Sequence, residues 1–168
     1  MRRIHIVGRK NHGKTTLMVE LIEEFARRGL RVGAMKHSAH AHELDRPGKD
    51  SYRHRHAGAN PAAIVTRDTV CVFRRRDADE DVYARMAPLF ADCDFVLVEG
   101  DFQQPGPKIE VWRASAGGEC LAAEHDTVLA VVSDDRGDVP VPVWPRHDVP
   151  GIAANILGLL RIGGGAPG

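Results

Sequence analysis

The sequence is poor in cysteine and carries no excess of charge of either sign. Its three cysteines form no C-x-x-C pair and their number is odd, which argues against a disulfide framework and indicates reduced thiols. Lysine plus arginine and aspartate plus glutamate each number 23, so the formal net charge is +0. This balance argues against broad binding to nucleic acids or anionic membranes. We therefore expect no nucleic-acid partner and no membrane partner.

Long apolar runs are also missing. No run approaches the ~18 apolar residues that a membrane-spanning helix needs. The basic start of the chain, MRRIHIVGRKNHGK, lacks the apolar stretch of a signal peptide. The protein is therefore expected in the cytoplasm. The length of 168 residues suits a single domain over residues 1–162, followed by a flexible tail, 163–168.

What the sequence does contain is an alternation of strand-like and helix-like segments. Strands are expected over residues 3–8, 30–36, 94–100, 107–113, 127–134 and 141–145, and helices over 13–29, 49–58, 79–91 and 148–162. Two further strands near 61–74 indicate an antiparallel hairpin, and Pro107 suggests that its strand lies near a sheet edge. The alternation predicts an α/β fold with three layers and a mostly parallel sheet.

The strongest motif is GRKNHGKT, residues 8–15, which fits the phosphate-binding pattern G-x-x-x-x-G-K-[ST] in full. A buried strand runs into it and an amphipathic helix leaves it, as in a P-loop NTPase. Glycines let the backbone N–H groups face a phosphate, and the helix N-terminus favours an anion. Lys14 is expected to reach the β- and γ-phosphates, and the Thr15 hydroxyl to bind Mg²⁺. The nucleotide-binding set expected in this loop is Gly8, Asn11, His12, Gly13, Lys14 and Thr15.

An acid is expected at the end of a neighbouring strand, where it would hold Mg²⁺ through water or orient the attacking water. Glu99 ends the apolar run DFVLVEG and fills this position. Asp45, which follows the strand over residues 30–36, is the second candidate. The sequence therefore predicts Lys14, Glu99 and Asp45 as the catalytic residues, and Thr15, Glu99 and Asp45 as the magnesium site.

Two acids late in the chain are candidates for contacting the base. Asp134 and Asp135 leave a buried strand where many guanine-specific NTPases place an acid that pairs with the N1 and N2 hydrogens of guanine. The Asn/Thr-Lys pair that usually precedes this acid is missing, so the residues alone do not decide whether the bound nucleotide carries guanine or adenine. Asp134 is taken as the base-contacting residue.

A polar segment, KHSAHAHELDRPGKDSYRH, begins at residue 36. Its histidines His37, His40 and His42 could collect a divalent metal ion. No cysteine is near and a loop gives no fixed scaffold, so histidines facing solvent or a ligand are favoured.

The same segment carries two cations. Arg46 and Lys49 suit phosphate recognition, and could meet the γ-phosphate or a second phosphorylated group such as a pterin phosphate. On residue types alone, a solvated turn is the alternative, because Pro-Gly is strong turn chemistry.

These residues resemble a known family. KHSAHAHELDRPGKDSYRHRHAGA resembles the segment after the second strand in MobB-type proteins of molybdopterin-guanine dinucleotide biosynthesis. FVLVEGDF and PKIEVWR are similar to that family's acidic strand and to the strand after it. With the phosphate loop, the similarity spans about residues 4–113. It implies GTP binding, slow hydrolysis if any, a homodimer, and assistance to the MobA-type guanylyltransferase that joins GMP to molybdenum cofactor. Molybdopterin is left open as a further ligand.

The resemblance also implies roles for single residues. It assigns phosphate and Mg²⁺ binding to Gly8, Gly13, Lys14, Thr15 and Thr16. It places Asp45, Arg46 and Lys49 in the family's characteristic loop, and matches Glu99 to the acidic strand end. The chain departs from the family at His12, where small residues are common, and at Asp101 after VEG.

Two other functions remain alternatives. A P-loop small-molecule kinase would usually need an arginine-rich lid late in the chain, whereas the RRR run falls at residues 74–76, in the hairpin. A metal-insertion GTPase, or metallochaperone, draws support from the histidines. The favoured hypothesis is a GTP-binding adapter of the MobB type that uses Mg²⁺. The lack of an obvious arginine finger or water-orienting glutamine favours slow hydrolysis of GTP.

Overall fold

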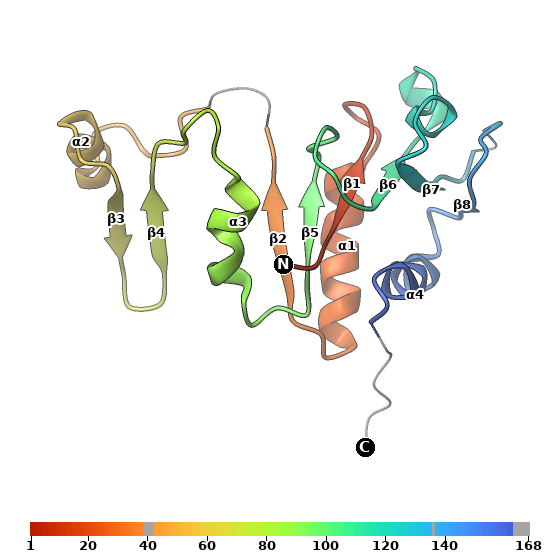
Figure 1. Cartoon of the computed structure of the whole chain (residues 1–168), viewed down its shortest axis with the longest axis horizontal. Coiled ribbons are helices and arrows are strands. Elements are labelled where there is room, and N and C mark those ends of the chain that lie inside the picture. Colours follow the sequence, from red (N-terminus) through yellow and green to blue (C-terminus); the bar gives the residue numbers. More distant parts are fainter. Residues whose placement is uncertain (39–41, 136, 163–168) are drawn as a thin grey trace. The chain divides into compact units, whose positions relative to one another are not determined.

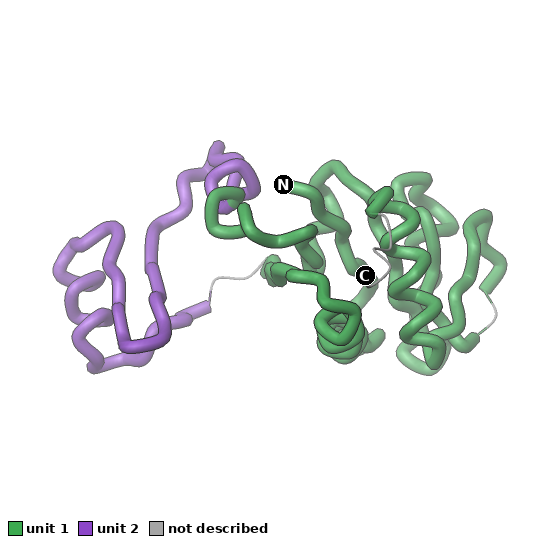
Figure 2. Tube along the Cα trace, turned by 90° about the horizontal axis from the view of Figure 1, so that it is seen from below, with its two compact units in different colours: residues 1–38, 87–168 green, residues 39–86 purple. Residues whose placement is uncertain are grey.

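The computed structural model describes residues 1–38, 42–135 and 137–162. The chain divides into two compact units, one of Met1–Ser38 with Ala87–Gly168 and one of Ala39–Met86 (Figure 2). The single domain expected over residues 1–162 stays a prediction, and the expected tail, 163–168, lies outside the described residues.

The first unit is built on a six-stranded sheet in the order β2-β5-β1-β6-β7-β8 (Figure 1). Its strands are β1 (Arg3–Val7), β2 (Val32–Lys36), β5 (Phe95–Glu99), β6 (Lys108–Val111), β7 (Val128–Val132) and β8 (Val143–Trp144). Neighbouring strands are parallel, so all of them end at the same edge of the sheet. The apolar run of β5, FVLVE, is buried along its whole length, as expected of a strand covered on both faces.

Two long helices, α1 (Lys14–Arg27) and α4 (Val149–Leu159), pack together and share one hydrophobic cluster with the sheet. Apolar residues at helical spacing in α1 are fully buried, and the Phe25 ring meets the Phe95 ring of β5 edge to face with centroids 4.9 Å apart. α4 begins at a capped end, because the Asp148 carboxylate accepts the Gly151 N–H at 3.0 Å.

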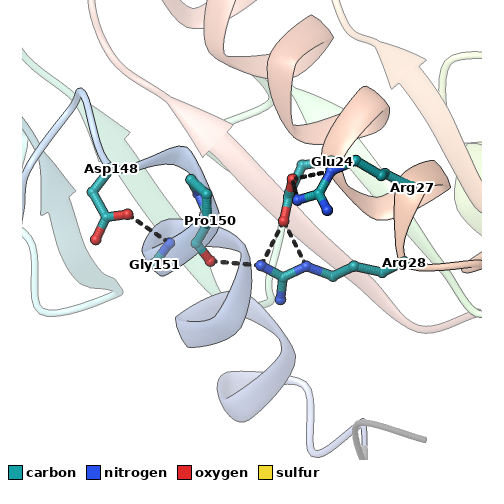
Figure 3. Close-up of polar contacts among 6 residues, drawn as sticks. All are labelled: Glu24, Arg27, Arg28, Asp148, Pro150 and Gly151. Atoms are coloured by element: carbon teal, nitrogen blue, oxygen red, sulfur yellow. Dashed lines mark hydrogen bonds and ion pairs between the residues drawn. The ribbon is translucent and has the colours of Figure 1, made fainter. Parts of the chain in front are cut away.

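The last turn of α1 is tied to the start of α4 through Glu24 (Figure 3). The buried Glu24 carboxylate accepts hydrogen bonds from Arg27 and from Nε of Arg28, the latter at 2.7 Å. Nη2 of Arg28 also donates to the Pro150 carbonyl at 2.8 Å. The Arg27 hydrogen bond is the main cause that lowers the pKa of Glu24, and the ionised carboxylate orients Arg28, which makes the bond to α4.

The opposite face of the sheet is covered by short elements. Since Phe95 faces α1, Val96 points the other way, and there Phe90 lies against Gly33 of β2. A Cβ atom on Gly33 would lie 2.4 Å from the Phe90 ring, so any larger residue would have to displace that ring. The 3₁₀ helices are η1 (Ala87–Phe90), η2 (Ala114–Ala116) and η3 (Leu121–Ala123). A second cluster around Cys120, Ala122, Val128 and Val131 completes this layer.

The second unit contains α2 (Asp50–His56), an antiparallel pair of strands, β3 (Ala62–Val65) and β4 (Val70–Phe73), and α3 (Val82–Met86). In this pair Val65 is opposite Val70, and Ala63 is opposite Val72. These four residues therefore share one face, and the three valines are 58–74% exposed. The unit thus presents an apolar face on a two-stranded sheet.

The predicted α/β fold, with a mostly parallel sheet and an antiparallel hairpin, is confirmed. One detail is wrong: β6 lies between β1 and β7 rather than near an edge. Pro107 precedes the strand, so its missing N–H leaves no gap in the ladder, and its carbonyl accepts the His5 N–H at 2.9 Å. Among the described residues, no helix is long and apolar enough to span a membrane.

Candidate functional site

The loop between β1 and α1 has the backbone shape that the motif predicts. Gly8 has φ +134°, and a Cβ atom there would lie 2.4 Å from the Val111 carbonyl oxygen. Asn11 and Gly13 also have positive φ, and Gly13 is the residue that precedes α1. The loop therefore turns tightly against the end of β6 and leads directly into the N-terminus of α1.

Lys14 lies over this loop. Its Nζ donates to the Arg9 carbonyl at 2.6 Å. Burial is the main cause that lowers the pKa of Lys14, while the charge of Glu99 raises it and that of Lys36 lowers it further. An added anion would oppose that burial effect, which fits a lysine that binds phosphate.

Thr15 and Glu99, two of the three residues predicted to hold Mg²⁺, lie in contact. The Thr15 hydroxyl donates to Oε1 of Glu99 at 2.8 Å, and the carboxylate is nearly buried. β5 is the sheet neighbour of β1, so its last residue ends beside the loop. A hydroxyl and a carboxylate are hard oxygen donors of the kind that Mg²⁺ prefers. Thr16 lies in the first turn of α1, beside Thr15.

Lys36 was not predicted as part of this site. It is the last residue of β2, on the other side of β5, and its Nζ donates to the same Glu99 oxygen at 3.0 Å. The only signal in the sequence is its position at a strand end, and this becomes informative once the strand order is known.

Asp45, Arg46 and Lys49 lie in the second unit. Asp45 is buried, and Oδ1 accepts the Arg46 N–H at 2.8 Å and the Ser51 hydroxyl at 2.9 Å. Arg55 lies 3.4 Å from Oδ2. These bonds show that Asp45 organises the turn before α2, while Arg46 and Lys49 are exposed. The catalytic and metal roles of Asp45, and contact of Arg46 and Lys49 with a phosphate, stay predictions.

The roles predicted for His37, His40 and His42 also stay predictions. Nδ1 of His37 lies 3.9 Å from an Asp101 oxygen, whereas His40 lies outside the described residues. His42 lines a pocket of about 400 Å³ in the second unit. Within residues 1–38, 42–135 and 137–162, no three His, Cys, Asp or Glu side chains are placed to hold a metal ion.

Asp134 lines a pocket at the end of β7. This pocket of about 460 Å³ is lined by Ser133, Asp134, Asp135, Gly137, Val143, Pro145 and His147. Oδ1 of Asp134 is 2.8 Å from Nδ1 of His147, and this bond is the main cause that lowers the pKa of Asp134. Asp135 instead accepts the Ala114 N–H at 2.8 Å. Asp134 is therefore an ionised, half-exposed acceptor, and His147 is a partner that the sequence did not reveal.

A last unpredicted contact joins the loop to the residues after β6. His12 is buried, and its Nδ1 accepts the backbone N–H of Arg113 at 3.0 Å. Nη2 of Arg113 donates to the Asn11 carbonyl at 2.5 Å. The bulky His12, unusual in such a loop, is thus a packed residue with a defined partner.

Comparisons with known proteins place this geometry in a family. The family described as MobB, molybdopterin guanine dinucleotide synthesis protein B, matches residues 3–134. The chain is 33% identical over 147 residues to the molybdopterin-guanine dinucleotide biosynthesis adapter protein of Escherichia coli, covering 84% of this chain and 83% of that protein. The protein of the same name from Haemophilus influenzae is 36% identical, with 88% of this chain and 83% of that protein covered.

Solved structures agree with these matches. The crystal structure of a MobB protein homolog from Bacillus stearothermophilus superimposes with a TM-score of 0.70 and 28% identity, over 96% of this chain and 99% of that one. The fold, the family match and two relatives that align over more than two thirds of both chains lead to the same assignment: this chain belongs to the MobB family.

Proposed function

We propose that this protein is a GTP-binding adapter in the guanylylation of molybdenum cofactor, with Mg²⁺ held beside the nucleotide. The observation that carries the proposal is the 2.8 Å contact between Thr15 and Glu99 at the end of the phosphate loop. With Lys14 in place, these residues supply the cation, hydroxyl and carboxylate that nucleotide and Mg²⁺ binding require.

Asp134 supports guanine as the base. An ionised carboxylate in a pocket accepts the N1 and N2 hydrogens of guanine, whereas adenine offers an unprotonated N1 that the carboxylate repels. Nδ1 of His147 already lies 2.8 Å from Oδ1 of Asp134, so a guanine that bonds to both carboxylate oxygens would share Oδ1 with His147.

The adapter role rests on the relatives, which are named as adapter proteins of molybdopterin-guanine dinucleotide biosynthesis. The partner we propose is the guanylyltransferase of the MobA type, with slow hydrolysis of GTP and with molybdopterin as a further ligand to test. A homodimer is supported by the apolar face of the second unit, because exposed Val65, Val70 and Val72 form a contiguous surface that a second copy could cover.

Calorimetric titration with GTP, ATP and GDP, each with and without Mg²⁺, tests the nucleotide part. GTP with Mg²⁺ is expected to bind best, and Lys14→Ala to abolish binding. Lys10→Ala is the matched control, because it removes an exposed lysine from the same loop. A preference for ATP would contradict the proposed base.

The adapter part needs a separate assay. Purified guanylyltransferase is given molybdopterin and GTP, with or without this protein, and the guanylylated cofactor is measured. The proposal expects more product with wild type than with Lys14→Ala. Equal product in all three reactions would contradict it.

A further inference from the structure

We propose that Arg113 is a second cation for the phosphates of the bound nucleotide, and that His12 is the residue that positions it. This inference rests on the proposed nucleotide binding. It adds a phosphate-contacting residue from the end of β6 to a loop whose motif lies entirely within residues 8–15.

The sheet brings Arg113 to the loop. β6 is the parallel neighbour of β1, so the residues that follow both strands emerge at the same edge. The approach is close, because the Val111 carbonyl touches the place where Gly8 would carry a Cβ atom. Arg113 follows two residues later, and its guanidinium atoms lie 3.8–4.0 Å from the corresponding position on Gly13.

The charge of Arg113 is not balanced in the part of the chain that the structure describes. Its side chain is exposed, and no carboxylate among residues 1–38, 42–135 and 137–162 forms an ion pair with it. Its guanidinium rests on the Asn11 carbonyl, just as the Lys14 ammonium rests on the Arg9 carbonyl. Two cations therefore bond to carbonyl oxygens of one loop, and an anionic ligand would give both of them a better partner.

His12 fixes the position of the backbone at Arg113. The backbone N–H of Arg113 can only donate, so Nδ1 of His12 is the acceptor and the proton of the neutral ring is on Nε2. Nε2 is buried and forms no hydrogen bond with any of the described residues. A buried donor without a partner is costly. His12 thus fixes the backbone at Arg113, from which the guanidinium reaches the loop, although its own Nε2 is left without a partner among the described residues.

The same segment reaches the base pocket. The residue after Arg113 donates its N–H to Asp135 at 2.8 Å, and Arg9 of the loop donates to the Glu119 carbonyl at 3.3 Å. Residues 113–119 thus join the phosphate loop to the pocket that contains Asp134. This bridge explains why a residue outside the motif would matter for nucleotide affinity.

The first test removes the charge of Arg113. Arg113→Gln keeps a polar side chain but loses the charge and is too short to reach the Asn11 carbonyl as Nη2 does, whereas Arg113→Lys keeps the charge. The affinity for Mg²⁺-GTP is expected to fall about tenfold or more in the glutamine variant, as for the loss of a hydrogen bond to a charged group. It should fall less in the lysine variant, and Arg2→Met, which replaces an exposed arginine before β1, should bind like wild type.

The second test concerns His12. The substitution His12→Asn places an amide oxygen near the position of Nδ1, so the new side chain can still accept the Arg113 N–H. The longer side chain in His12→Gln moves its polar group away from that position. We expect His12→Asn to retain the affinity for Mg²⁺-GTP that His12→Gln loses. Because His12 acts through Arg113, His12→Gln should have little further effect in the Arg113→Gln background.

The outcomes distinguish this inference from the proposed function. If wild type binds GTP and Lys14→Ala does not, but Arg113→Gln binds like wild type, the inference fails and nucleotide binding stands. If wild type binds neither GTP nor GDP, both fail. A third outcome concerns His12. If His12→Asn and His12→Gln lower the affinity for Mg²⁺-GTP equally, and the loss in His12→Gln adds to that of Arg113→Gln in the double variant, His12 is a packing residue and its positioning role is refuted. Unfolding midpoints measured without nucleotide serve as the control for folding.

Discussion

Replacing Glu99 by glutamine should separate magnesium binding from the stability of the fold. The substitution keeps the shape of the side chain and an oxygen that can accept the Thr15 hydroxyl, so the 2.8 Å contact can persist. It removes the negative charge that faces Lys36 at 3.0 Å and that a bound Mg²⁺ would need.

The stability cost follows from the exposure of the two partners. At 3.0 Å, Coulomb attraction between unit charges is about 5.5 kcal/mol at an effective dielectric constant of about 20, and about 1.4 kcal/mol in water. The Lys36 side chain is 64% exposed, so water screens the pair and rehydrates the ammonium once Glu99 is neutral. The half-buried Lys14 also loses the favourable charge of Glu99, but it keeps its hydrogen bond to the Arg9 carbonyl. The free energy of unfolding should therefore change by no more than about 1 kcal/mol, or a few degrees in Tm.

Binding should respond differently. In wild type, Mg²⁺ is expected to raise the affinity for GTP, and in Glu99→Gln this gain should be lost. The assay is titration with GTP at fixed and zero Mg²⁺, together with urea unfolding of the protein without nucleotide. A variant that keeps the full Mg²⁺ effect would refute the placement of the metal. A loss of more than about 3 kcal/mol in stability would refute the reasoning about screening.

Three further substitutions test other parts of the structure. Glu24→Gln should cost about 1 kcal/mol at neutral pH; because the pKa of Glu24 is lowered in the folded protein, the difference from wild type should shrink as the pH falls below 4.5 and vanish below the lowered pKa, as measured by unfolding across pH. Gly8→Ala should cost about 2 kcal/mol or more in urea unfolding, since the new Cβ atom would meet the Val111 carbonyl at 2.4 Å; Gly29→Ala, at a position that also has positive φ but meets nothing within 4 Å, should cost less. Asp134→Asn should weaken GTP binding about tenfold and favour xanthosine triphosphate, whose base offers an oxygen where guanine has an amino group; unchanged preference in a competition titration would remove Asp134 from the base site.

The elements and the phosphate loop could be predicted because their signals are local. The motif over residues 8–15 is contiguous, and its strand and helix are coded by adjacent apolar patterns. Glu99 was found because a strand-ending acid is expected by the chemistry of Mg²⁺. Its distance from Thr15 depends on β5 lying beside β1, which the structure supplies.

Lys36, Arg113 and His147 could not be predicted, since each gains its meaning from a strand order that sequence position does not reveal. In sequence, Arg113 is 101 residues from His12, and His147 is 13 residues from Asp134. The wrong prediction that β6 lies near an edge has the same origin. Pro107 shows only that one residue lacks an N–H donor, whereas the position of β6 in the sheet depends on its neighbours β1 and β7.

The parallel sheet explains why the candidate site residues of the first unit lie along one edge of it. Gly8, Glu99, Arg113 and Asp134 end or follow β1, β5, β6 and β7, and parallel strands deliver all of these residues to the same side. β6 has the decisive place because it separates the strand of the phosphate loop from the strand of the base pocket. Two consecutive N–H groups after it bond to His12 on one side and to Asp135 on the other. A shift of this segment would therefore move the proposed phosphate and base subsites together, so β6 rather than either loop alone sets the spacing between them.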